Sequence, residues 1–189
     1  MDIKKLLSKE DLQHLSELIG RKYVCLAGVS MMPTLNTDSF YLVAEGLALS
    51  IWGDFDIETI GADDDEFSFF RVEIAQESEI AQHRAKGEVY YRHSGDEIID
   101  IYLARLSMHQ IIGENKNLVF ETDRTIIIKL SGGSLALSRR SLHLEMIEAT
   151  FSAGNAKPMT GKISTHYSEN DEEVFEITET MVTLANAIG

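Results

Sequence analysis

The stretch TIIIKLSGGSLALS, residues 125–138, decides the fold class. A run of apolar, mostly β-branched residues ends at Leu130, a Ser-Gly-Gly-Ser segment follows at 131–134, and an alternating apolar run then resumes. Two glycines between two strand-forming runs are typical of a β-hairpin turn. The wider region 117–151 contains further runs of this kind, so we expect an antiparallel meander of three or four strands there.

The first half of the chain has a similar pattern. The segment Leu-Ala-Leu-Ser of the hairpin occurs also at 47–50, again after a glycine, and the alternating segment 54–60 predicts a half-buried strand. We therefore predict a mainly β (α+β) fold, with antiparallel sheets arranged as a sandwich or an open barrel. A single domain over 1–189 is expected. Its halves, 21–105 and 106–189, are candidates for an internal duplication, although four identical residues of common types also arise by chance.

Residues 8–19 predict a helix before the strands. Ser8 can cap it, with Asp11 three residues further on, and Gly20 is a typical C-terminal stop. One apolar face at helical spacing is formed by Leu12, Leu15, Leu18 and Ile19.

Other local patterns are less regular. A second short helix is expected at 76–86, a solvated turn at 63–66, and a hairpin at 87–106 with its turn at 94–96. The tail from 163 onward mixes strand and helix signals.

Composition restricts the partners and the compartment. The net charge of −14 disfavours nucleic acid and anionic membranes and favours a basic protein partner, although acidity also serves solubility alone. The single Cys25 excludes an internal disulfide and fits a reducing cytoplasm. We expect no membrane span, signal peptide, metal site or cofactor, and leave a homo-oligomer open.

An acidic band is the candidate binding surface. Between Asp54 and Glu79 the chain has ten acids and one base, Arg71. Thr59 stands where a calcium loop would need glycine, so we interpret this acidic segment as a strand rather than as a metal loop. Trp52 beside the acids suits an interface anchor, and it suits a core position as well. The candidate binding residues are Trp52, Asp54, Asp56, Glu58, Asp63, Asp64, Asp65 and Glu66.

One short stretch suggests catalysis instead. Residues 28–35, GVSMMPTL, resemble the Gly-x-Ser-Met-x-Pro-Thr-Leu box of signal peptidases and of self-cleaving repressor proteases. The resemblance implies that Ser30 is a nucleophile and that a buried, neutral lysine takes its proton. The lysine pair of those families is missing at a matching distance. Arg71 stands where a lysine is sought, and arginine cannot act as a base. The best substitute is Lys129.

The chain as a whole resembles two loosely defined groups. It is similar to small single-domain bacterial proteins of unknown function, which have a short helix ending in residues such as LIGRK (18–22) followed by two β-rich halves. It also resembles acidic immunity proteins. The second resemblance implies binding of a basic protein, since immunity proteins of this kind neutralise basic toxins. We expect a non-enzymatic protein-binding module, immunity- or adaptor-like, that binds through its acidic face. The alternatives are a Ser-Lys peptidase using Ser30 and Lys129, and a β-barrel with a hollow interior that binds a small ligand.

Overall fold

The computed structural model describes residues 3–28, 35–60, 63–92, 94–112, 114–139, 146–154, 161–167 and 174–189. For residues 36, 58–60, 63–66 and 161–167 it describes the backbone alone. Within these ranges the chain is mainly β, with strands in two largely antiparallel sheets and three short helices, as predicted. None of the helices in the described ranges is both long and apolar enough to span a bilayer.

The larger sheet has the strand order β12-β13-β8-β9-β10-β11-β3, and β1 pairs in parallel with the first half of β9. Its strands are β1 (Ile3–Lys5), β3 (Leu35–Thr37), β8 (Ile98–Ile112), β9 (Asn115–Leu130), β10 (Gly133–Arg139), β11 (Ile147–Ser152), β12 (Gly161–Tyr167) and β13 (Val174–Thr183).

The smaller sheet has the order β6-β5-β4-β2-β7. Its strands are β2 (Tyr23–Ala27), β4 (Ser39–Ala44), β5 (Leu47–Ile60), β6 (Asp63–Ile74) and β7 (Val89–Tyr90). The helices are α1 (Lys9–Ser16), α2 (Glu77–Lys86) and α3 (Leu184–Ile188).

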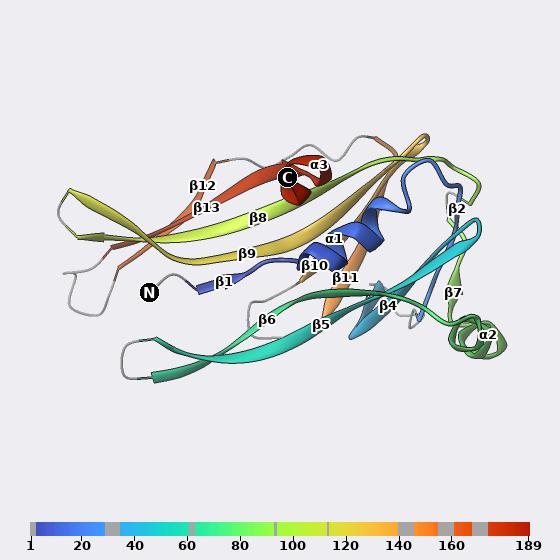
Figure 1. Cartoon of the computed structure of the whole chain (residues 1–189), viewed down its shortest axis with the longest axis horizontal. Coiled ribbons are helices and arrows are strands. Elements are labelled where there is room, and N and C mark those ends of the chain that lie inside the picture. The colour runs from blue at the N-terminus through green and yellow to red at the C-terminus, as the bar shows by residue number, and fades with distance from the viewer. Residues whose placement is uncertain are drawn as a thin grey trace.

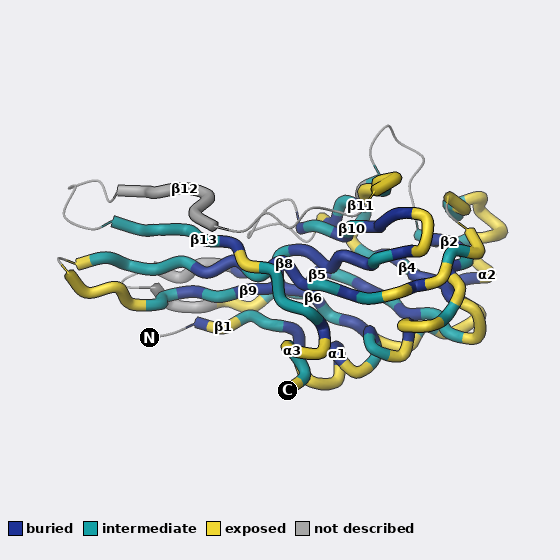
Figure 2. The backbone as a smooth tube through the Cα atoms, turned by 90° about the horizontal axis from the view of Figure 1, so that it is seen from above, coloured by how far each residue is buried: buried dark blue, intermediate teal, exposed yellow. Residues whose placement is uncertain are grey.

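The two sheets form two layers, and α1 lies between β9 of the larger sheet and β6 of the smaller one (Figure 1). One cluster of buried apolar side chains joins both sheets and α1. The Leu-Ala-Leu-Ser segments lie in β5 and β10, and Leu49 and Leu137 enter this core from different sheets. The backbone coloured by burial shows the buried residues along the middle of the long strands (Figure 2).

Three local predictions were wrong. Residues 63–66 belong to β6 and pair with β5 down to Ile60↔Asp63 instead of forming a solvated turn. The segment 87–106 is not one hairpin, because β7 pairs with β2 and β8 pairs with β9 in the other sheet. The turn near Gly95 is held to the start of β2 by two backbone hydrogen bonds with Tyr23, which directs the chain from one sheet to the other. Ile19 is exposed rather than part of the apolar face of the helix.

The Asp11 carboxylate connects α1 to the edge of the smaller sheet. Its Oδ2 accepts a hydrogen bond from the Ser8 backbone N–H at 2.7 Å and completes the predicted capping box. Its Oδ1 accepts one from the Val72 backbone N–H, also at 2.7 Å. His14 Nδ1 lies 3.0 Å from the Val72 carbonyl oxygen and donates to it in the Nδ1–H tautomer. The helix thereby satisfies backbone groups on the outer edge of β6, a site otherwise open to a foreign strand.

Replacing this carboxylate should cost stability. Asp11→Ala removes the helix cap and leaves the Val72 N–H without its acceptor, so we expect the free energy of unfolding to fall by about 2–4 kcal/mol. Urea denaturation measures the change. The control is Glu10→Ala, an exposed neighbour in the same turn, for which we expect a change within about 0.5 kcal/mol. Equal effects of the two substitutions would contradict this role for Asp11.

Candidate functional site

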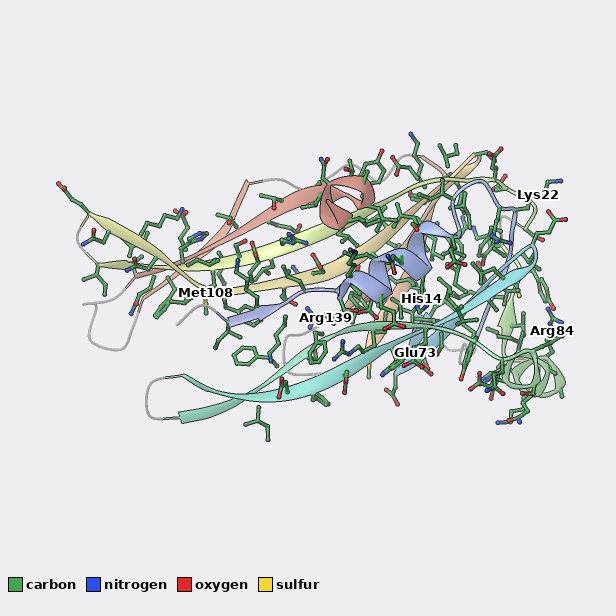
Figure 3. The ribbon with its side chains drawn as sticks, in the orientation of Figure 1. His14, Lys22, Glu73, Arg84, Met108 and Arg139 are labelled. Atoms are coloured by element: carbon green, nitrogen blue, oxygen red, sulfur yellow. The ribbon has the colours of Figure 1, made fainter. Side chains whose placement is uncertain are left out.

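A groove of about 400 Å³ lies between the N-terminus of α1 and the strands β5 and β6. We call it the acidic groove. It is lined by Ser8, Glu10, Asp11, Trp52, Asp54, Arg71, Val72 and Glu73. Figure 3 labels Glu73 and His14, which mark the strand side and the helix side of this region.

Strand alternation explains which side chains enter the groove. Trp52 pairs with Arg71 across the β5–β6 ladder, and Asp54 pairs with Phe69. Side chains two residues apart on a strand share a face, so Trp52 and Asp54 lie beside Arg71 and Glu73. The alternate residues Ile51 and Phe70 face the core and are almost completely buried. Because the apolar side chains of this hairpin face the core, the polar side chains at the alternate positions face the groove.

The groove has a negative charge. Four carboxylates and one guanidinium line it, which makes its formal charge three negative. The guanidinium of Arg71 lies against the Phe69 ring, 4.7 Å from its centroid, with Nε 3.4 Å from Asp54 and Nη1 3.8 Å from Asp11. Arg71 is therefore held by these three groups, and Glu10 and Glu73 are exposed carboxylates at the same groove.

Of the predicted binding residues, the structure brings Trp52 and Asp54 into the groove. Asp56 lies further along β5 and pairs with Lys5 at 2.6 Å, and this hydrogen bond holds the pKa of Asp56 below its usual value. The rest lie in the distal half of the β5–β6 hairpin, described in backbone only: Glu58, Asp63, Asp64, Asp65 and Glu66.

Sequence reasoning missed Glu10, Asp11 and Glu73 as groove residues. The available signal for Glu73 was its spacing of two residues from Arg71 on one strand, which places both side chains on the same face. No local signal places α1 beside β6.

A second hollow of about 400 Å³ lies under α2, beside the turn between β4 and β5. We call it the alanine hollow. Its apolar lining includes Val43, Ala48, Ile74, Ala75 and Ile80, and the charged side chains Glu77 and Arg84 also border it.

Cys25 is packed with Val43 and Ile80 and is fully buried. Burial raises the pKa of the thiol, and the nearby Arg84 guanidinium opposes this effect without reversing it. A thiol that stays protonated is a poor nucleophile, so Cys25 is a packing residue.

The proposed peptidase pair is not assembled in the described residues. Ser30 lies outside them. Lys129 is half-buried on β9, opposite Asp100 on β8 and Ser134 on β10. In the part of the chain that the structure describes, no three His, Cys, Asp or Glu side chains are grouped to hold a metal ion.

A buried polar cluster joins the two sheets. Arg139 on β10 is 1% exposed, and its guanidinium donates to Ser68 Oγ at 3.0 Å and to Thr122 Oγ1 at 2.6 Å. It also donates to the Asp123 carbonyl oxygen at 3.1 Å and lies over the Phe70 ring. Burial lowers the pKa of Arg139 to about 10, and the Asp123 carboxylate opposes that effect. These bonds span β10, β9 and β6, so we interpret Arg139 as a structural connection.

Removing Arg139 tests this interpretation. Arg139→Ala leaves a void and strips Ser68 and Thr122 of a charged donor, so we expect the free energy of unfolding to fall by about 3–5 kcal/mol. Arg139→Met fills the volume without a buried charge and should cost clearly less. Urea denaturation of both variants, with exposed Lys22→Ala as control, measures the difference. Identical losses for Ala and Met would contradict a contribution from the void and would assign the whole loss to the hydrogen bonds of the guanidinium.

No protein-family model, curated protein or solved structure matches this chain. The function is therefore argued from the geometry of the acidic groove and the alanine hollow.

Proposed function

We propose that this protein is a non-enzymatic binding module that holds a basic segment of another protein in the acidic groove. The observation that supports this is that Trp52 and four carboxylates line one groove, in which the single cation, Arg71, is paired internally. Carboxylates attract and orient a lysine or arginine side chain, and an indole ring adds apolar area and a cation–π surface. Such a role suits an adaptor- or immunity-type protein in a reducing cytoplasm, where a free cysteine persists.

The size and exposure of the groove limit the kind of ligand that it can bind. A hollow of about 400 Å³ accommodates one or two side chains rather than a folded domain. Glu10 and Glu73 are exposed, so a bound cation remains close to solvent and its attraction is screened by salt. We therefore expect modest affinity for a short segment and a strong dependence on ionic strength.

A short lysine–serine peptide tests the proposal, with a glutamate–serine peptide as the negative probe. Trp52 is the single tryptophan, so its fluorescence reports directly on the groove. We expect the basic peptide to change this emission. We also expect the affinity to fall as the ionic strength rises from about 0.01 M to about 0.15 M, since the Debye length shortens from about 30 Å to about 8 Å.

Charge reversal locates the binding. Glu10→Lys combined with Glu73→Lys should raise the dissociation constant of the basic peptide about tenfold or more. The matched control is Glu97→Lys with Glu114→Lys, which changes the net charge equally at exposed positions outside the groove; we expect an increase below about threefold. The proposal fails if both double variants weaken binding equally, or if the basic peptide does not bind.

A further inference from the structure

The acidic groove and the alanine hollow open on the same face of the smaller sheet. On β5, Trp52 lines the groove and Ala48 lines the hollow, and the two are separated by an even number of residues. Beside β5, Glu73 of β6 lines the groove, and Ala75, the residue that follows the end of β6, lines the hollow. The β5–β6 ladder is regular up to Leu49↔Ile74, and the Ala75 N–H donates to the Ala48 carbonyl oxygen at 2.9 Å, which continues the pairing by one residue. Side chains at alternate positions of a regular strand share a face, so a single segment can contact both sites.

The two sites differ in chemistry. The acidic groove has a formal charge of three negative. In the alanine hollow the charges of Glu77 and Arg84 balance, and small side chains leave apolar space. The groove therefore suits a cation, and the hollow suits an aliphatic side chain.

The distance between the sites sets the spacing in the partner. Trp52 and Ala48 are four residues apart on β5, which is about 13 Å at the rise of a strand. An extended segment covers this distance with side chains at positions i and i+4, which point to the same side. In a helix those positions lie about 6 Å apart, too close to reach both sites.

We propose that the partner of this protein contributes an extended segment with a lysine or arginine at one position and a leucine, isoleucine or methionine four residues away. The basic side chain enters the acidic groove and the aliphatic side chain enters the alanine hollow. This inference rests on the proposed function and adds the conformation and spacing of the bound segment. The charge complementarity between the acidic groove and a basic segment selects this occupant.

A peptide series tests the spacing. Each peptide has one arginine and one leucine on a serine–threonine background, with the leucine three, four or five residues from the arginine; a fourth peptide lacks the leucine. Titration against the full chain, followed by Trp52 fluorescence, gives the dissociation constants. We expect the peptide with the four-residue spacing to bind at least fivefold more tightly than the others. Spacings of three and five residues direct the leucine away from the sheet face.

Filling the hollow tests the second site. Ala48→Leu should remove the advantage of the four-residue spacing and leave the binding of the leucine-free peptide unchanged. Ala75→Leu is the independent second variant. Ala85→Leu, an exposed position on α2 that does not line the hollow, is the matched control. Thermal unfolding of each variant confirms that the fold is retained.

The outcomes separate this inference from the proposed function. If all four peptides bind equally and all still depend on Glu10 and Glu73, the spacing inference is wrong and the acidic groove remains a binding site. If no peptide binds in a way that depends on Glu10 and Glu73, both are wrong. Tightest binding at another spacing also overturns the proposed geometry.

Discussion

The Asp11 carboxylate has a position on which both the fold and the candidate site depend. It is 4% exposed, caps its own helix and accepts a hydrogen bond from the Val72 backbone of β6. Burying a carboxylate is unfavourable unless its oxygens are satisfied, and two backbone N–H groups satisfy this one. Because the two N–H groups come from different elements, the fixed geometry of one carboxylate sets the position of α1 against the smaller sheet.

The acidic groove follows from that placement. With α1 held at β6, Glu10 lies on the helix side and Glu73 on the strand side of one hollow. Arg71 would neutralise an exposed acid if its side chain were free to move, and it is held between Asp11, Asp54 and the Phe69 ring. The fold therefore uses its local cation internally and leaves the Glu10 and Glu73 carboxylates exposed.

Local patterns predict the parts of this protein whose partners are close in sequence. Ser8 and Asp11 form the expected capping box, and the turn at 131–134 joins β9 to β10 as expected. The position of α1 was not predictable, because the bond from Val72 to Asp11 joins residues 61 apart. The same reason applies to β7, because Val89 and Tyr90 pair with Ala27 and Leu26 of β2, which lie far earlier in the chain. Thus the sequence could identify Trp52 and Asp54 as candidate binding residues, and it could not identify Glu10 as one.

The two Leu-Ala-Leu-Ser segments show how tertiary neighbours decide what a local pattern becomes. In both, the second leucine is fully buried in the same core, so the alternation has the same structural consequence. The alanines differ. Ala136 lies between Ile127 and Thr150 on its two neighbouring strands, whose β-branched side chains flank it. Ala48 lies beside Val43 and near Ala75, and α2 passes over them without filling the space. Ala48 lines a hollow because one of its neighbours, Ala75, is also small, and that depends on strand pairing rather than on the segment itself.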